Sequence, residues 1–263
     1  MINISGINKY MTFGLKQEWI SVLASEREDF RSTTALGNRM IPSAVAWFRE
    51  AKLISASVAI QPTRLLDVGQ RFGFDYQIFW DSIWLGLINT SPLMKWYVCN
   101  VLINETRTQD ELDEKLAKSV ASASVRKGAL QSLCGTFKAS PLGVGASPVV
   151  ELELKGARVI SLKRMAHSIA PLVVLYSFYV MAQTADRVSF TISEMMSGDF
   201  ESPYVSPLMA FGMPVDELKA QCVGLATKYP DFIACPFTLG LDEVKVFPKD
   251  KTIDDVVGLI LGE

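Results

Sequence analysis

The residues that could carry out nucleophilic or metal-dependent chemistry are few and widely separated in this sequence. The 263 residues include one histidine, His167, and four cysteines that are isolated from one another. A serine or cysteine nucleophile normally needs a neighbouring base, most often a histidine. Because His167 opens an apolar stretch, the sequence favours a hydrogen-bonded or surface histidine over a catalytic one.

Neither the cysteines nor the clustered carboxylates have the spacing of a metal site. Zinc sites usually hold cysteines about two to four residues apart, unlike Cys99, Cys134, Cys222 and Cys235. Their apolar surroundings indicate buried, reduced thiols. The carboxylates of 110–114 and 254–255 stand at expected helix starts, where negative charge stabilises the helix dipole. The sequence therefore predicts no catalytic residue, no metal and no cofactor, and a hydrolase or nuclease is the outside alternative.

Composition points to a globular protein with no membrane segment. Apolar residues make up 49% and charged residues 21%, and the net charge of −2 argues against a non-specific nucleic-acid binder. The start lacks the pattern of a signal peptide. The two most apolar stretches, 169–182 and 78–103, are too short or too interrupted to span a bilayer. We expect both to be core helices of a cytoplasmic protein.

The first quarter of the chain has the order of a winged helix-turn-helix. A helix is expected over 15–25, and a very short helix after Thr33 that Gly37-Asn38 ends. Pro42 then suits the first turn of a second helix, whose buried stripe is Ile41, Ala44, Val45, Phe48 and Ala51. Residues 55–60 alternate like a strand. An ordinary helical hairpin is the alternative.

The same plan recurs further along the chain. Helices are expected over 79–88 and 92–103, where the aromatic residues favour a core over a base-stacking platform. Thr108 and Glu111 have capping-box spacing at the start of a second helix-turn-helix. A loop over 140–145 leads to a hairpin over 149–154 and 158–162, and a long helix follows over 165–183. A short helix (192–196), a helix over 214–227, a hairpin (232–238 and 243–247) and a helix over 252–261 complete the chain.

We therefore expect a mainly α protein with small β-hairpins, in which winged helix-turn-helix-like units surround a buried helical core. The predicted divisions are an N-terminal winged helix-turn-helix-like unit (1–75), a helical middle region with the second such unit (76–148), and a C-terminal region with a hairpin, the buried helix and a third unit (149–263).

Charge asymmetry suggests where nucleic acid would bind. Residues 27–64 include six basic and three acidic side chains, whereas residues 231–263 include three basic and seven acidic ones. Because the second helix of a helix-turn-helix contacts phosphates and base edges, the candidate DNA-binding residues are Asn38, Arg39, Ser43, Arg49, Lys52, Arg126 and Lys127. The competing interpretation is that these charges are solvated and that the units bind other proteins.

Several short blocks, in order, resemble an uncharacterised prokaryotic family, the domain of unknown function four thousand and seven. The blocks cover roughly residues 10–247 and are Thr12-Phe13-Gly14-Leu15, Trp19, Ala35-Leu36-Gly37-Asn38, Val45-Ala46-Trp47-Phe48, Leu53-Ile54, Phe74-Asp75-Tyr76, Trp84, Ser91-Pro92, Trp96-Tyr97, Ser202-Pro203 and Gly240-Leu241. One departure stands out. Family members have a histidine–glutamate pair before the Thr-Phe, where this chain has Lys9-Tyr10-Met11.

The resemblance implies a role in phage-defence and DNA-modification islands that often encode a sulfurtransferase of the kind that installs phosphorothioate in DNA. It implies a non-catalytic accessory subunit that works with a sulfurtransferase-like or ATPase subunit. Double-stranded DNA is a further candidate partner, which the helix-turn-helix pattern suggests. The resemblance provides no site residues. A protein–protein adaptor that docks such a subunit without touching DNA is the main alternative, and the acidic overall charge favours it.

Overall fold

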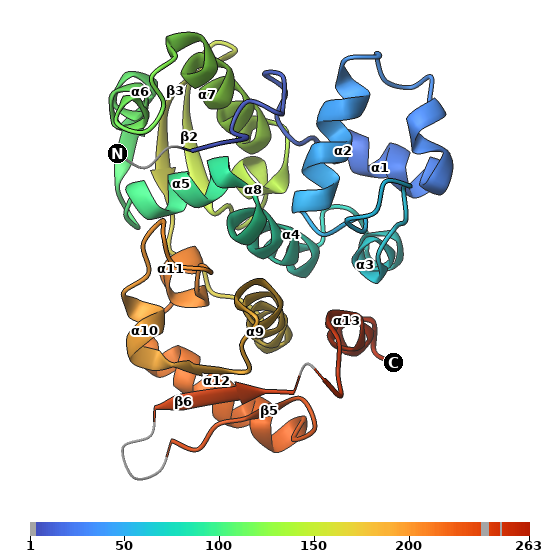
Figure 1. The fold of residues 1–263 in the computed structure, drawn as a ribbon, viewed down its shortest axis with the longest axis vertical. Helices are drawn as coiled ribbons and strands as arrows, with labels where there is room; N and C mark the ends of the chain where they lie inside the picture. The colour runs from blue at the N-terminus through green and yellow to red at the C-terminus, as the bar shows by residue number, and fades with distance from the viewer. Residues whose placement is uncertain (1–3, 238–241, 248) are drawn as a thin grey trace.

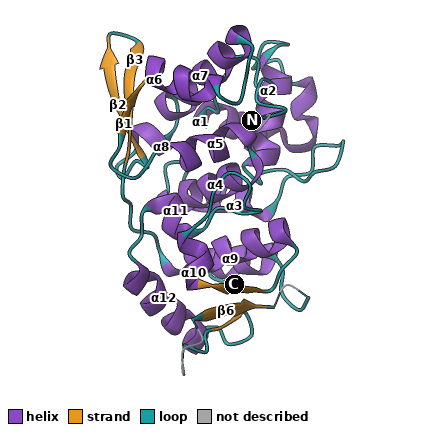
Figure 2. Ribbon diagram, turned by 60° about the vertical axis from the view of Figure 1, so that its left-hand side comes forward, coloured by secondary structure: helices purple, strands orange, loops and turns teal. Residues whose placement is uncertain are grey.

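The computed structural model describes residues 4–237, 242–247 and 249–263, and helices make up most of it (Figure 1). Two small antiparallel sheets lie apart from each other at the edges of the helical core (Figure 2). The predicted class, mainly α with small β-hairpins, is confirmed. In chain order the elements are α1 (Gln17–Glu26), η1 (Arg27–Ser32), α2 (Met40–Glu50), α3 (Arg64–Phe72), α4 (Gln77–Thr90), α5 (Pro92–Asn100), β1 (Thr106–Thr108), α6 (Gln109–Ala117), α7 (Ala123–Lys138), α8 (Pro141–Val144), β2 (Val150–Lys155), β3 (Arg158–Arg164), α9 (Pro171–Ala185), β4 (Ser189–Thr191), α10 (Ile192–Met196), α11 (Pro207–Phe211), α12 (Val215–Lys228), β5 (Ile233–Ala234), β6 (Glu243–Val246) and α13 (Ile253–Leu261).

The N-terminal helices differ from prediction at two places. Helix α3 over Arg64–Phe72 was not predicted. The short helix expected after Thr33 is absent there, and a 3-10 helix, η1, occupies Arg27–Ser32 instead. Phe30 explains this second difference, because its ring is fully buried and packs edge-on against Phe48 of α2 at 5.1 Å. Burial of this one ring draws the charged segment around it into a tight turn. Helix α2 follows the prediction: Ala44, Val45, Phe48 and Ala51 of the expected stripe are buried, and Ile41 is half-buried against the core.

The segment 55–60, expected as a strand, forms a loop. A single bridge between Ile54 and Pro62 closes it. The serine side chains make local bonds instead of leaving the backbone to pair, since Ser57 Oγ donates to the carbonyl oxygen of Ala59 at 2.8 Å and pairs with Ser55 Oγ at 2.7 Å. Such local bonds compete with a strand ladder. The strand predicted after α2 is therefore wrong.

Helices α4 and α5 lie in the centre of the molecule. The indoles of Trp80, Trp84 and Trp96 are buried, so these aromatic residues form the core, as predicted. Helix α4 packs against both α5 and α9. Within the described ranges, none of the helices is both long enough and apolar enough to cross a bilayer.

A compact unit follows in the order β1, α6, α7, β2, β3. The capping box predicted at the start of α6 is present, with Thr108 and Glu111 each bonding to the other's backbone amide. Strand β3 pairs with both β1 and β2, so the sheet order is β1-β3-β2. The hairpin thus belongs with α6 and α7, on which it packs. The boundary expected between residues 148 and 149 instead falls inside this unit, because pairing with the unpredicted strand β1 holds the hairpin there.

Two proline residues set helix boundaries that the prediction missed. Pro141 begins the short helix α8 inside the segment expected as a loop. Pro171 stands at the first position of α9, which therefore starts later than the predicted residue 165. The residues before Pro171 are extended, because His167 N donates to the carbonyl oxygen of Phe211 at 2.8 Å and Met165 N to that of Val149 at 2.9 Å.

The C-terminal part repeats the topology of the middle unit. Its elements run β4, α10, α11, α12, β5, β6, and its sheet has the order β4-β6-β5. In both sheets the last strand pairs with the other two. The hairpin predicted here is present, although its turn at 239–242 lies partly outside the described residues. Helix α13 then packs on α3 and α9.

Candidate nucleic-acid interface

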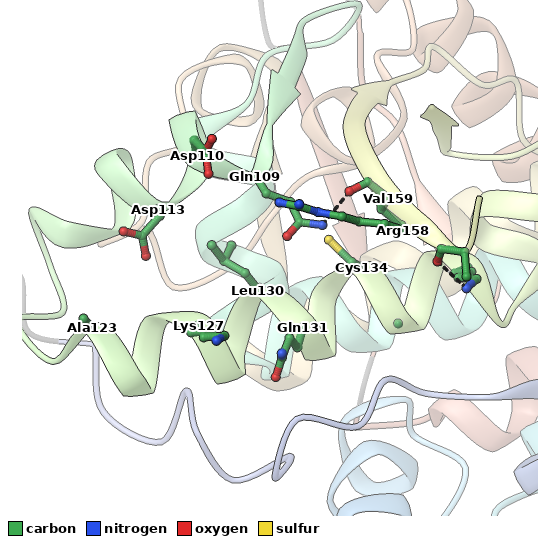
Figure 3. Close-up of a pocket in the computed structure, with 13 residues that line it drawn as sticks. Gln109, Asp110, Asp113, Ala123, Lys127, Leu130, Gln131, Cys134, Arg158 and Val159 are labelled. Carbon is green, nitrogen blue, oxygen red and sulfur yellow. Dashed lines mark hydrogen bonds between the residues drawn. The ribbon is translucent and has the colours of Figure 1, made fainter. Parts of the chain in front are cut away.

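A surface hollow of about 740 Å³ lies between α6, α7 and the β2–β3 hairpin. Figure 3 shows α6 with Asp110 and Asp113 on one side of it and α7 on the other. The lining residues are Gln109, Asp110, Asp113, Ala123, Lys127, Leu130, Gln131, Cys134, Gly135, Lys138, Ala157, Arg158 and Val159.

Helix α7 contributes the polar face of the hollow. Its apolar residues Leu133 and Phe137 are buried, while Lys127, Gln131 and Lys138 are exposed. Residues four and seven apart lie on the same side of a helix, so these three polar side chains form one row. A row of cationic and amide side chains along an exposed helix can contact phosphates and base edges.

The hairpin closes the far side of the hollow. Lys138 Nζ donates to the carbonyl oxygen of Ala157 at 2.6 Å, and Gln109 Nε2 donates to that of Val159 at 2.7 Å. These bonds join the hairpin to α7 and to α6. Arg158 is exposed beside them. The hairpin is thus held in a defined position relative to the polar row of α7.

The side chains around the hollow carry charges of both signs, and the positive charges outnumber the negative ones. Three cations line it, Lys127, Lys138 and Arg158, together with the carboxylates Asp110 and Asp113. Arg126 neutralises Asp113 by a bidentate pair, with Nε and Nη2 at 2.9 and 3.2 Å from its two oxygens. The net charge of this surface is therefore positive although that of the chain is negative.

Arg126 and Lys127, adjacent in sequence, have different roles in the fold. Besides binding Asp113, Arg126 Nη1 donates to the carbonyl oxygens of Val120 and Ala121 at 3.0 and 2.9 Å. Its side chain therefore ties α6 to the start of α7. Lys127 is exposed on the hollow. Of these two predicted residues, Lys127 is the one that the fold leaves free to meet a ligand.

The predicted residues of the first unit separate along α2. Asn38 and Arg39 are exposed just before the helix. Ser43 is fully buried, and its hydroxyl donates to the carbonyl oxygen of Tyr10 at 2.8 Å. We therefore remove Ser43 from the DNA-contacting set, because a duplex at the surface does not reach it.

Arg49 and Lys52 lie at the other end of α2. Arg49 Nη2 donates to the carbonyl oxygen of Ser57 at 2.8 Å, and Lys52 Nζ donates to Gln183 Oε1 of α9 at 3.1 Å. Both side chains line a second cavity, apart from Asn38 and Arg39. The fold does not bring the seven predicted residues onto one surface.

Among the residues of the hollow that the sequence prediction did not name are the exposed side chains of Gln131, Lys138 and Arg158. The first two could have been found from their spacing, since they continue the row begun by Lys127 opposite the apolar stripe of α7. Arg158 could not, because its place beside α7 depends on the pairing of β3 with β1.

The single histidine is buried and hydrogen-bonded. His167 Nε2 lies 3.0 Å from Asp81 Oδ1, which also accepts a bond from Gln77 Nε2 at 2.8 Å. The exposed fractions of the His167 and Asp81 side chains are 6% and 2%. The pair links α4 to the segment before α9. Of the two non-catalytic roles that the sequence indicated for His167, the hydrogen-bonded one is present.

The cysteine thiols and the carboxylates at helix starts also occupy positions in which they serve the fold. All four cysteines are free, and burial raises the pKa of the Cys134 thiol to about 12. Glu111 caps α6 through the backbone amide of Thr108, which is the main cause lowering the pKa of its carboxyl group. Asp255 caps α13 in the same way, and its hydrogen bonds to Thr252 lower its pKa. These carboxylates have the capping role that the sequence predicted.

No protein-family model matches the chain, and no curated protein matches it in sequence. Its fold is similar to that of SspB. A magnesium ion-bound SspB crystal structure superposes with a TM-score of 0.69 at 12% identity, over 98% of this chain and 87% of the SspB chain. A second SspB crystal structure gives a TM-score of 0.65 with the same identity and coverage.

One of the two SspB structures contains a magnesium ion, which raises the question of which side chains of this protein could bind one. Magnesium prefers carboxylate and other oxygen ligands. Within the part of the chain that is described, no group of three or more His, Cys, Asp or Glu side chains lies close enough together to hold a metal ion. What the comparisons establish is the fold, shared with SspB over nearly the whole chain.

Proposed function

We propose that this protein is a non-catalytic DNA-binding accessory protein of a prokaryotic DNA-modification or phage-defence system of the phosphorothioation type. Its DNA-binding surface would be α7 with the β2–β3 hairpin. The assignment to such a system rests on the resemblance to the domain of unknown function four thousand and seven. DNA binding rests on the middle unit.

The observation that carries the DNA-binding part is the topology of that unit. We interpret the order α5, β1, α6, α7, β2, β3, with its β1-β3-β2 sheet, as a winged helix-turn-helix. In such a unit the second helix of the pair enters the major groove and the hairpin lies along the neighbouring backbone. Helix α7 would be the recognition helix, and it carries the row of Lys127, Gln131 and Lys138.

Each side chain has a role in this arrangement. Lys127 and Arg158 would contact phosphates on either side of the groove, because both are exposed cations. Gln131 lies between the two lysines on α7, and glutamine can bond to both N6 and N7 of an adenine. Asn38 and Arg39, exposed before α2, would be a second contact. Phosphate contacts of this kind release counterions, so binding would weaken steeply with salt.

The test is the salt dependence of duplex binding. We expect the double variant Lys127→Met with Arg158→Met to bind a labelled duplex more weakly and to reduce the slope of log affinity against log salt by about two. The matched control is Lys228→Met with Lys249→Met, which removes two exposed cations of the C-terminal region. If the first double variant binds with the same slope as the parent protein, this surface is not the DNA site.

A protein–protein adaptor remains the second candidate, and a specific observation favours it. Asp110 lines the same hollow as Lys127, and the whole chain has a net charge of −2. A hollow with both signs of charge also suits a polar protein partner. Co-purification with a sulfurtransferase-like or ATPase subunit, with no shift of the duplex at low salt, would decide for the adaptor.

A further inference from the structure

A second cavity, of about 420 Å³, lies where four elements from distant parts of the chain meet. They are the end of α2 with the loop that follows it, the start of α3, the middle of α9 and the start of α13. In Figure 1 α13 lies beside α3 and α9. The volume is within the range of small-molecule sites, which is about 300 to 1,000 Å³.

Two cations at this cavity are held by neutral oxygens. Lys52 Nζ donates to the amide oxygen of Gln183, and Arg49 donates to the carbonyl oxygens of Ser57 and Val58. Burial lowers the pKa of the Lys52 ammonium group. A half-buried cation that meets amide oxygens keeps an attraction for an anion, because no opposite charge has neutralised it.

The backbone at Lys52 ends helix α2 and is held in one position. Its φ angle is +60°, in the left-handed region, as is common just after a helix, and Lys52 N donates to the carbonyl oxygen of Arg49 while Leu53 N donates to that of Phe48. Thr63 Oγ1 donates to the Lys52 carbonyl oxygen at 2.6 Å and holds the residue there. These bonds keep Lys52 in the lining of the cavity.

Tyr176 supplies a free polar group in the same place. It lines the cavity from α9, its side chain is fully buried, and its hydroxyl has no hydrogen-bond partner among the residues that the structure describes. Buried tyrosine hydroxyls normally find a partner. Tyr179, one turn further along α9, does so through the carbonyl oxygen of Phe232 at 3.0 Å. The hydroxyl of Tyr176 therefore has hydrogen-bonding capacity that the described residues do not use.

The start of α13 adds a negative charge, and the lining adds an apolar surface. Asp254 lines the cavity and is exposed, so an anionic group would bind on the Lys52 side. The remaining lining includes apolar side chains that could cover a flat ring: Ile54, Leu65, Ile253 and Val257.

We propose that this cavity binds a phosphate monoester with a flat apolar body, of which a nucleoside monophosphate is the representative. Lys52 and Arg49 would bind the phosphate, and the hydroxyl of Tyr176 would bond to the sugar or the base. The site is independent of the DNA-binding surface. Because it joins α2, α3, α9 and α13, its ligand would tie the C-terminal helix to the N-terminal helices.

Calorimetric titration of the full chain with AMP, adenosine and inorganic phosphate tests this proposal. We expect AMP to bind at least about tenfold more tightly than adenosine or phosphate, because each of these lacks one half of the contacts. Lys52→Met should weaken AMP binding by about tenfold, the effect of one charge-assisted hydrogen bond. Tyr176→Phe should weaken it by about fivefold.

Two controls keep the result interpretable. Tyr176→Phe removes a hydroxyl that has no partner among the described residues, so this variant should fold as the parent does. Lys127→Met, on the other surface, should bind AMP as the parent protein does even if it loses DNA. The proposal fails if AMP gives no binding heat up to about 10 mM, if phosphate alone binds as tightly as AMP, or if the Lys52 and Tyr176 variants bind AMP as the parent does.

Discussion

Gly14 of the N-terminal segment lies against the backbone of Gly135 in α7. A β-carbon added at Gly14 would stand 2.0 Å from the Thr136 nitrogen and 2.2 Å from the Gly135 carbonyl carbon. Beside this contact, Leu15 N donates to Thr136 Oγ1 at 2.9 Å and Gln17 N to the Ala139 carbonyl oxygen at 3.1 Å. In Figure 3 the N-terminal segment, in blue, runs next to α7. The segment therefore braces the helix that carries the polar row.

Replacing Gly14 by alanine should destabilise the protein. The new methyl group would overlap backbone atoms of α7 that cannot move aside as a flexible side chain can, so we expect a loss of about 2 to 4 kcal/mol in the free energy of unfolding. Urea denaturation followed by circular dichroism measures it. The matched control is Gly224→Ala in α12, where an added β-carbon meets nothing within 4 Å. This control should gain about 0.5 to 1 kcal/mol from helix propensity. Equal stability of the two variants would contradict the close contact.

Replacing Arg164 should cost more stability than replacing Arg126 or Arg158. The guanidinium of Arg164 is buried and donates to the carbonyl oxygens of Val98, Val101 and Ala210 at 2.8, 2.6 and 3.4 Å, and to that of Met209. Burial lowers its pKa to about 10. The ends of α5 and α11 offer the partial negative charge of their last carbonyls. Arg164→Met leaves those carbonyls unpaired and should cost about 3 kcal/mol.

The comparison for Arg164 is Arg158→Met on the same strand. Arg158 is exposed, so its replacement should change the free energy of unfolding by less than about 0.5 kcal/mol. Thermal and urea denaturation of both variants provide the measurement. Similar losses in the two would mean that the buried bonds of Arg164 contribute little.

Replacing Arg126 should lower stability, whereas replacing Lys127 should weaken DNA binding. Arg126→Ala removes the bidentate pair with Asp113 and the bonds to two carbonyls between α6 and α7, so we expect a loss of about 1 to 2 kcal/mol in stability. Lys127→Ala should leave stability within about 0.5 kcal/mol of the parent and weaken duplex binding. Denaturation and gel-shift measurements on both variants check this. A Lys127 variant that unfolds more easily than the Arg126 variant would refute the assignment.

Glu50 makes stability depend on pH in a direction that can be checked. Its carboxyl group is buried, and burial is the main cause that raises its pKa above the ordinary value of 4.5, against the opposing effects of Lys9 and Tyr10. The folded state therefore holds this proton more tightly than the unfolded state. As the pH rises from the ordinary pKa to the raised one, the unfolded state releases the proton first, and the protein loses stability from this group.

Glu50→Gln removes that titration. The free energy of unfolding of the parent protein, relative to that of the variant, should therefore be higher at about pH 4 than at about pH 8. Other carboxyl groups, such as those of Glu111 and Asp255, have lowered pKa values and give the opposite trend, but they are the same in both proteins. A difference that does not change with pH, or that grows with pH, would contradict the raised pKa.

Lys9 and Tyr10 attach the N-terminal segment to α2. Both contact Glu50: Lys9 Nζ forms an ion pair with Oε1, and the Tyr10 hydroxyl donates to Oε2 at 2.5 Å. Tyr10 also stacks on Trp47 at 3.8 Å. These contacts therefore pack the N-terminal segment on α2. Sequence alone could not reveal this, because Tyr10 and Glu50 are 40 positions apart.

By itself the sequence determined several of the helices and the capping box of α6. The repeat of apolar residues along α2 and α7 and the capping box of Thr108 with Glu111 depend on neighbours within one or two turns, so local pattern is enough to predict them. The hairpins were predictable for the same reason. The pairing of β3 with the distant strand β1 was not predictable from sequence. The position of β2 and β3 beside α7 is therefore seen only in the structure.

Tertiary structure decided which of the candidate residues meet. Ser43 is buried and bonded to the Tyr10 carbonyl oxygen. Arg49 and Lys52 line a cavity together with Tyr176, whereas Lys127 lines the hollow beside α7. Tertiary structure also joined His167 to Asp81, 86 positions earlier. The physical reason is that burial and side-chain pairing depend on how separate helices pack, and packing is set by shape and apolar area over the whole core, not by the pattern within any one segment.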